Sequence, residues 1–465
     1  MLSALNLGDI LSILLFATIC FSILLGYPIA FTLAGTSLIF AGLGILLGVF
    51  DTRVLGALPN RYFTSMINEV LVAVPLFIFM GLVLERSGIA EKLLTTMGEL
   101  FGPLRGGVGY AVVLVGAVLA ASTGVVGATV VTMGLISLPA MLRASYSPRL
   151  ATGVICASST LAQIIPPSTV LIFIGDILTG VNQAAQMARG NFAPDPISVG
   201  DLFAGAMLPG LMLVSLYLLW VTYKAVFQPE SCPAIQLSPD EKAGLPGRVL
   251  FALLPPLLLI IAVLGSILAG IATATEASSI GALGALVLAA LNGKLSWEVV
   301  RQASHNTMVT ASLIFVIVFG ASLFSLVFRG LGGEHMVTEA LKAMPGGVFG
   351  AMFIVMFVMF ILGFFLDTFE IILIMVPICG PALLQLGVDP VWLGVLIGVN
   401  LQTSFLTPPF GFTLFYMRGV APQTITTGDI WLGALPWVGL QATGLGIVWY
   451  FPVLATWLPS IVFGN

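Results

Sequence analysis

The stretch ASSTLAQIIPPS, from Ala157 to Ser168, places two consecutive prolines inside an apolar segment that covers residues 150–180. Proline lacks a backbone N–H and its ring clashes with the preceding helical turn, so a helix should break here. A second apolar segment, 391–418, contains LTPPFGF from Leu406 to Phe412 and predicts a second break. For either segment alone, a kinked structural helix is the simpler alternative.

The composition around these segments predicts an all-α polytopic membrane protein. Hydrophobic residues make up 59% of the 465 residues and charged residues only 8%, whereas soluble domains carry about 25% charged residues. Apolar runs of about 20 residues, enough to cross a bilayer, recur along the chain. A net charge of −4 without a basic stripe argues against nucleic-acid binding, and the four cysteines show no metal-binding spacing. Plain spans are expected at 9–25, 29–49, 69–86, 201–223, 249–268, 272–291, 306–328 and 431–455.

Two further regions, 107–141 and 347–386, predict re-entrant hairpins. Small polar residues and glycines lie at the centre of the first, and Gly363 to Glu370 (GFFLDTFE) at the centre of the second. Irregular backbone at membrane depth is tolerated where it is buried in protein or lines a wet cavity. Residues Ser296 to Ser304 form an amphipathic stretch that is expected to lie along the cytoplasmic interface.

These features repeat along the chain. The double prolines are 242 residues apart, and the hairpin centres near Gly124 and Asp367 are offset by 243. Five crossings in each half require the second half to be inverted relative to the first, an architecture of many secondary transporters. The expected organisation is a first repeat at 1–225, a cytoplasmic linker at 226–248 and a second repeat at 249–465, with about ten spans, two hairpins and two discontinuous helices.

Basic residues predict the orientation. When the expected spans are followed in order across the membrane, eleven of the 16 Lys and Arg residues lie on one side of it. An excess of basic residues marks the cytoplasmic side. The first hairpin then enters from the cytoplasm and the second from outside, and both termini lie outside.

Four clusters of small polar residues mark a candidate site. Helices that start or end inside the membrane expose N–H groups and carbonyls, which suit a carboxylate and Na⁺ respectively. Hydrogen bonding between helices is the structural alternative for these side chains. The clusters lie at the two hairpins and the two broken helices: Ser122, Thr123, Gly124 and Gly127; Ser158, Ser159, Thr160, Gln163, Ser168 and Thr169; Asp367 and Thr368; Asn400, Gln402, Thr403, Ser404 and Thr407.

Acidic residues within the membrane are costly and usually functional. Asp367 is expected to ligate a cation, to carry a proton, or to cap the second helix of its hairpin. Glu276, in the run TATEASS, is expected to cap its helix or to brace a neighbouring broken helix, with the structural role favoured; Glu370 and Asp176 are weaker candidates. No catalytic triad, metal motif or phosphate loop is present, so the chain is not expected to be an enzyme.

The same motifs resemble the large membrane subunit of tripartite ATP-independent periplasmic (TRAP) transporters. The resemblance is carried by VPLFIFMGLVLERSGIAEKL (Val74 to Leu93), ASSTLAQIIPPS and LTPPFGF, with support from TATEAS (Thr273 to Ser278) and FGPLRGG (Phe101 to Gly107). It covers nearly the whole chain. A subgroup associated with keto-acid or lactate uptake is suggested by 182–200 and STGVVGATVVTMG.

This resemblance implies a sodium-coupled elevator importer of small organic acids, with no cofactor besides Na⁺. It implies a separate four-helix small membrane subunit, a periplasmic substrate-binding protein and a location in a bacterial or archaeal inner membrane. One cation site would use Ser122, Thr123, Gly124, Ser158, Ser159 and Pro166, and the other Gly363, Asp367, Thr403 and Pro408. Substrate would lie near Ser168, Thr169, Asn400, Thr407 and Phe410. Ser122-Thr123-Gly124 departs from the Ser-Gly-Ser type tip of many relatives, which leaves the hydroxyl ligand open.

Two other hypotheses remain. A stand-alone sodium- or proton-coupled organic anion symporter would share this architecture but lack a binding protein and a small subunit. A membrane channel would show ion conductance. A membrane enzyme would require a set of catalytic residues.

Overall fold

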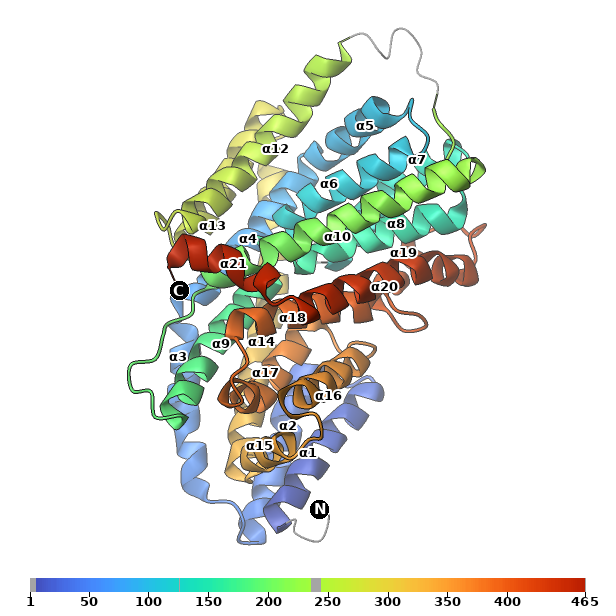
Figure 1. Ribbon diagram of the computed structural model, residues 1–465. Helices are drawn as coiled ribbons and strands as arrows, with labels where there is room; N and C mark the ends of the chain where they lie inside the picture. Colours follow the sequence, from blue (N-terminus) through green and yellow to red (C-terminus); the bar gives the residue numbers. More distant parts are fainter. Residues whose placement is uncertain (1–5, 125, 236–243, 465) are drawn as a thin grey trace. The chain divides into compact units, whose positions relative to one another are not determined.

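The computed structural model describes residues 6–124, 126–235 and 244–464 (Figure 1). Every regular element in those ranges is a helix. Ten helices there are long and apolar enough to cross a membrane, in keeping with the fold class expected from the sequence. Residues 236–243, in the middle of the predicted linker, lie outside the described ranges.

The first half of the chain begins with apolar helices and ends with a long one. Its helices are α1 (Leu7–Leu24), α2 (Ile29–Leu46), η2 (Thr52–Ala57), α3 (Leu58–Met66), α4 (Glu69–Arg86), α5 (Ile89–Phe101), α6 (Gly107–Thr123), α7 (Val126–Arg143), α8 (Pro148–Thr160), η3 (Leu161–Gln163), α9 (Thr169–Ala188), α10 (Val199–Phe227) and η4 (Pro229–Ser231). Helices α3 and α4 meet at a bend of 49°.

The second half repeats much of this order. Its helices are α12 (Leu245–Leu268), α13 (Ala274–Leu291), α14 (Trp297–Gly330), α15 (Gly333–Lys342), α16 (Gly347–Leu362), α17 (Thr368–Gln385), α18 (Pro390–Leu406), α19 (Phe412–Val420), α20 (Thr427–Tyr450) and α21 (Val453–Phe463). The eight plain spans expected from sequence are present with ends shifted by a few residues, except at the start of α14.

Residues Ser296–Ser304, which are expected to lie along the cytoplasmic interface, are continuous with the long helix α14. The Ser296 hydroxyl accepts a hydrogen bond of 3.2 Å from the backbone N–H of Val299, and α14 then runs without interruption from Trp297 to Gly330. A serine cap satisfies an N–H that the first helical turn leaves unpaired, so it sets where a helix begins. Residues 297–304 are therefore the first turns of a 34-residue helix.

Short helices before each hairpin extend the internal repeat. Helix α5 begins at Ile89 and α15 at Gly333, an offset close to that of the double prolines. Each follows a glycine in the left-handed region, Gly88 at φ +69° and Gly332 at φ +94°, where other residues are strained. These amphipathic helices were missed because they are too short to register as spans.

The chain forms two compact units, and each unit draws on both halves of the sequence. Unit 1 comprises Met1–Leu71, Phe173–Ser198 and Val309–Pro390, and it includes the α16–α17 pair. Unit 2 comprises Val72–Ile172, Val199–Met308 and Val391–Asn465, and it includes the α6–α7 pair, α8 and most of α18 to α21. Within unit 2, α8 packs against α6, α7 and α20.

Both predicted breaks are confirmed. Helix α8 ends at Thr160, continues for one short turn as η3, and α9 starts only at Thr169. Helix α18 ends at Leu406 and α19 starts at Phe412. Both double prolines contain a cis peptide bond. Each predicted hairpin region is likewise a pair of helices, α6–α7 and α16–α17.

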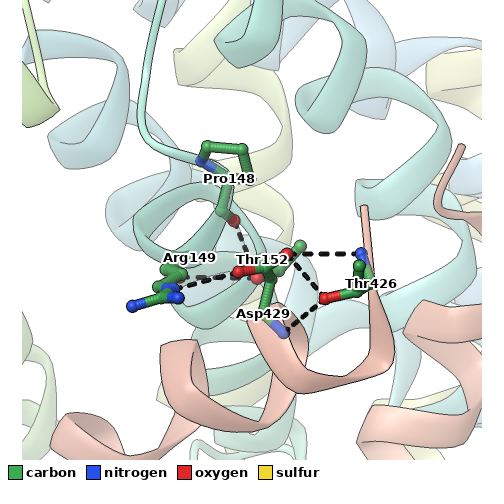
Figure 2. Close-up of polar contacts among 5 residues, drawn as sticks. All are labelled: Pro148, Arg149, Thr152, Thr426 and Asp429. Atoms are coloured by element: carbon green, nitrogen blue, oxygen red, sulfur yellow. Dashed lines mark hydrogen bonds and ion pairs between the residues drawn. The ribbon is translucent and has the colours of Figure 1, made fainter. Parts of the chain in front are cut away.

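The start of α8 is held against the start of α20 (Figure 2). Arg149 Nε and Asp429 Oδ1 form an ion pair of 3.0 Å, and the Thr426 hydroxyl donates to Asp429 Oδ2 at 2.7 Å. Deeper along the same pair of helices, a Cβ added to Gly153 would lie 2.6 Å from Trp437 Nε1. The absence of a side chain at Gly153 therefore lets α8 and α20 approach closely.

Candidate functional site

The residues proposed for the first cation site all belong to unit 2. The tip of the α6–α7 pair contains Gly124, whose φ of +60° places it in the left-handed region. Its carbonyl oxygen accepts a hydrogen bond of 2.7 Å from the hydroxyl of Thr169, at the start of α9. A Cβ on Gly124 would lie 3.0 Å from Thr169 Cγ2. The tip of the α6–α7 pair and the start of α9 are therefore in direct contact.

Ser158 is the notable polar group of this region. Its side chain is 0% exposed, and its hydroxyl oxygen has no hydrogen-bond partner among the described residues. A Cβ added to Gly116 of α6 would lie 2.6 Å from Ser158 Cβ, so α6 covers this serine. A buried hydroxyl without a hydrogen-bond partner lowers the stability of the folded state. A bound cation that this hydroxyl ligates would remove that cost.

The neighbouring hydroxyls donate to helix carbonyls. Ser159 donates to the Ile155 carbonyl oxygen at 2.8 Å. Ser168 donates to the Gln163 carbonyl oxygen at 3.0 Å, which bridges the break between η3 and α9. Hydroxyl oxygens that donate in this way still have lone pairs for a cation. Ser122 and Thr123 end α6, and their side chains lie outside what the structure describes.

The residues proposed for the second cation site belong to different units. Gly363 and Asp367 belong to unit 1, whereas Thr403 and Pro408 belong to unit 2. Asp367 is the N-cap residue of α17, and its backbone N–H donates to Glu370 Oε2 at 2.7 Å. Thr403 donates to the Val399 carbonyl oxygen at 2.8 Å. The capping position expected for Asp367 is present, and Glu370 completes that cap.

Glu276 has the structural role that the sequence favoured. Its carboxylate accepts hydrogen bonds from the backbone N–H of Thr273 at 2.8 Å and from the Thr273 hydroxyl at 3.0 Å. Its own N–H donates to the Thr273 hydroxyl oxygen at 3.2 Å. This reciprocal pattern is a capping box, which starts α13.

The five candidate substrate residues all lie in unit 2. Ser168, Thr169 and Asn400 are buried, Thr407 is half-buried, and Phe410 is 44% exposed. Thr407 donates to the Thr403 carbonyl oxygen at 2.7 Å. A Cβ on Gly398 of α18 would lie 3.2 Å from Ile164 Cδ1, so α18 packs against the break of the first discontinuous helix.

A buried polar network links the two discontinuous helices. Gln441 Nε2 donates to Thr160 Oγ1 at 2.9 Å and to the Tyr217 hydroxyl oxygen at 2.6 Å. Gln402 Nε2 donates to the same Tyr217 oxygen at 3.2 Å. Tyr217 on α10 and Gln441 on α20 were not expected from the sequence, because an isolated polar residue in an apolar span gives no sign of its partner.

Gly127 has a packing role. A Cβ at this position would lie 2.8 Å from Tyr416 Cζ on α19. Helix α7 therefore lies directly against the second part of the second discontinuous helix. Within unit 2, the hairpin and both breaks form one connected region.

Comparisons with known proteins match this chain to one transporter family. The family model described as "Tripartite ATP-independent periplasmic transporter, DctM component" matches residues 16–454. The C4-dicarboxylate TRAP transporter large permease protein DctM of Rhodobacter capsulatus is 30% identical, with 95% of this chain and 99% of that protein covered. Its Vibrio cholerae counterpart is 27% identical, with 97% and 98% covered. Among solved structures, the Alcanivorax borkumensis YdaH transporter is similar in fold, with a TM-score of 0.60, 14% identity and 89% of each chain covered.

Proposed function

Because this chain belongs to the DctM family of TRAP transporter large permeases, we propose that it takes up small organic acids and that a sodium gradient drives this uptake. The membership confirms the resemblance seen in its motifs, and it makes the chain a multi-pass membrane protein and not an enzyme. Beyond this membership, we propose sodium coupling, an elevator movement and organic acids as the substrate class.

The buried, unpartnered hydroxyl of Ser158 is the observation that carries sodium coupling. It lies two residues before α8 ends, where the carbonyl oxygens of Ser158 and Ser159 accept from the backbone N–H of Leu161 and each keep a lone pair for a cation. Hydroxyl and carbonyl oxygens are the ligands that hard monovalent cations accept. Ser122, Thr123, Gly124, Ser159 and Pro166 complete this proposed site, and Gly363, Asp367, Thr403 and Pro408 the second.

Organic acids are proposed as cargo because the relatives are named as C4-dicarboxylate permeases. The start of α9 is a helix N-terminus inside an apolar region, and its positive end favours a carboxylate. Ser168, Thr169, Asn400, Thr407 and Phe410 are the proposed contacts. As in other TRAP systems, a periplasmic binding protein would deliver the acid and a small membrane subunit would join this chain, with both termini on the periplasmic side.

Thermal unfolding in NaCl, KCl and choline chloride of equal concentration tests the sodium claim without a known substrate. A ligand that binds only the folded state adds about 2.7 kcal/mol at a hundredfold excess over its dissociation constant. We expect a sodium-specific rise in Tm that Ser158→Ala and Asp367→Ala reduce. Equal melting in all three salts would contradict sodium coupling and turn attention to a proton.

Ser137→Ala is the matched control for Ser158→Ala. Ser137 is also buried, and its hydroxyl also has no partner among the described residues, but it lies on α7 away from the breaks. Removing either orphaned hydroxyl relieves a similar desolvation cost in KCl. Only Ser158→Ala should reduce the additional stability in NaCl.

A stand-alone symporter without a binding protein is the alternative function. Purification of the chain from its native membrane under mild conditions separates the two, because a TRAP large subunit should bring a small four-helix chain with it. Purification of a fully active chain alone would favour the stand-alone symporter.

A further inference from the structure

Unit 1 contains a polar cavity that the proposed transport site does not use. Its volume is about 240 Å³, and its polar lining comes mainly from Arg61, Ser65, Asn68, Asp176, Ser322 and Ser325. At about 30 Å³ per water molecule, it has room for roughly eight waters. That volume suits a small metabolite rather than a drug-sized ligand, whose sites begin at about 300 Å³.

Arg61 gives the cavity a cationic side. Within the described ranges its guanidinium forms no ion pair and no hydrogen bond. The nearby charges are Arg329 and Glu334, which form an ion pair with each other. A guanidinium is always charged, and Glu334 is paired with Arg329, so the planar set of N–H donors of Arg61 is open to a carboxylate.

The hydroxyl groups beside Arg61 already donate hydrogen bonds to backbone carbonyls. Ser65 donates to the Arg61 carbonyl oxygen at 3.1 Å, and Thr64 donates to the Asn60 carbonyl oxygen at 2.9 Å. Their oxygen lone pairs remain as acceptors. The arginine therefore supplies the donors on this side of the cavity.

Asp176 gives the cavity an acceptor side. Asn68, at the bend between α3 and α4, donates from Nδ2 to Asp176 Oδ1 at 2.8 Å. The Asn68 side chain is itself fixed, since its Oδ1 accepts from the backbone N–H of Val70 at 3.0 Å. One carboxylate oxygen is thus held in place, and the half-buried side chain keeps capacity for a further donor.

We propose that this cavity binds a small carboxylic acid that also carries a hydroxyl or amino group, with its carboxylate on Arg61 and its donor group on Asp176. An acid without that donor would leave the Asp176 side unmatched, and a neutral amide would leave Arg61 unmatched. The cavity shares no residue with the proposed substrate region in unit 2, and it does not depend on sodium coupling. It is a second organic-acid site in the same chain.

Cysteine labelling tests the cationic character of the cavity. Ser322→Cys places a thiol in its wall, in a background in which Cys20, half-buried unlike the other three cysteines, is replaced by alanine. The readout is the rate of labelling by anionic sulfonatoethyl methanethiosulfonate divided by the rate of labelling by the cationic trimethylammonioethyl reagent. Arg61→Gln should lower this ratio at least about tenfold, because it removes the cation and leaves the Asp176 carboxylate in the wall. Arg53→Gln, which changes an exposed arginine that does not line the cavity, should leave the ratio unchanged.

Protection from labelling then tests the ligand. L-lactate should slow the labelling of the thiol introduced by Ser322→Cys, propionate should do so more weakly, and lactamide should have no effect. Arg61→Gln should remove protection by lactate, and Asp176→Asn should make lactate and propionate equivalent. Each variant is first required to melt within a few degrees of the parent, so that misfolding does not imitate the loss.

The proposal is overturned by any of three results: labelling by neither reagent, which would mean that the cavity is closed; a labelling ratio that Arg61→Gln leaves unchanged; or protection by lactamide equal to that by lactate. A failure of sodium-dependent melting would leave all three readouts unchanged, so the two claims fail independently.

Discussion

The hydroxyl of Thr169 donates a hydrogen bond of 2.7 Å to the carbonyl oxygen of Gly124, joining the start of α9 to the tip of the α6–α7 pair. The two residues are 45 positions apart, and each lies where a helix is interrupted. The carbonyl group of Gly124, at the end of α6, therefore has its partner at the start of α9. We expect changes at either residue to affect the cation site before they affect the fold.

Gly124→Ala should weaken sodium binding. An L-residue in the left-handed region costs about 1–2 kcal/mol, and the new Cβ would press on Thr169 Cγ2 at 3.0 Å. Thr169→Val should cost about 1 kcal/mol through the lost hydrogen bond. Both should reduce the Tm difference between NaCl and KCl. The control is Gly190→Ala, at φ +84° with open space around it, which should lower Tm equally in both salts.

Tyr217→Phe should destabilise the protein by about 1–3 kcal/mol, the cost of leaving a buried donor unsatisfied. The change removes the acceptor shared by Gln441 and Gln402. Tyr110→Phe is the comparison, because its hydroxyl makes one exposed bond of 3.0 Å to Thr222. Chemical denaturation in detergent measures both, and equal losses would show that the buried network has no special weight.

Gly153→Ala should destabilise the contact between α8 and α20. The new methyl group would lie 2.6 Å from Trp437 Nε1 and would also meet the backbone of Gly433. Gly446→Ala, in the same helix as Gly433, has no atom within 4 Å of its new Cβ. That control should be neutral or stabilising by up to about 1 kcal/mol, because alanine favours helix more than glycine does. Similar Tm values for the two variants would contradict the close approach of the helices.

Thr426→Ala should cost more than Arg149→Gln. The threonine caps α20 by accepting from the Asp429 N–H at 3.2 Å, and losing a cap costs about 1 kcal/mol. The ion pair between Arg149 and Asp429 is exposed, with relative accessibilities of 58% and 27%, and such pairs contribute about 0–1 kcal/mol. Unfolding at low and high salt should show that only the Arg149 effect is screened. The reverse ranking would mean that the ion pair holds α8 in place.

The sequence identified the interruptions because proline and glycine act locally. The two breaks fall at the double prolines that begin at Pro166 and Pro408, although α12 continues without a break through Pro255 and Pro256. The cap at Glu276 depends on a partner only three residues away. The start of α14 was placed too late because Ser296 was not recognised as a cap. The positions of the two interruptions were therefore predictable, whereas the ends of several helices were not.

Long-range partners were not predictable. Ser158 and Ser159 are neighbours with the same chemistry, yet Ser159 donates to Ile155 and Ser158 has no partner among the described residues. Gln402 and Tyr217 are 185 residues apart, so nothing local relates them. In the sequence Arg61 indicated only the orientation of the chain, because nothing local relates it to Asp176, which lines the same cavity.

Equilibrium binding of ²²Na⁺ to the purified chain tests whether Ser158 belongs to a cation site. We expect two saturable sodium ions per chain, displaced by unlabelled Na⁺ but not by K⁺. Ser158→Ala should retain one of them and Ser137→Ala should retain both. No saturable binding, or binding that Ser158→Ala leaves unchanged, would contradict the assignment of this buried hydroxyl to a cation site.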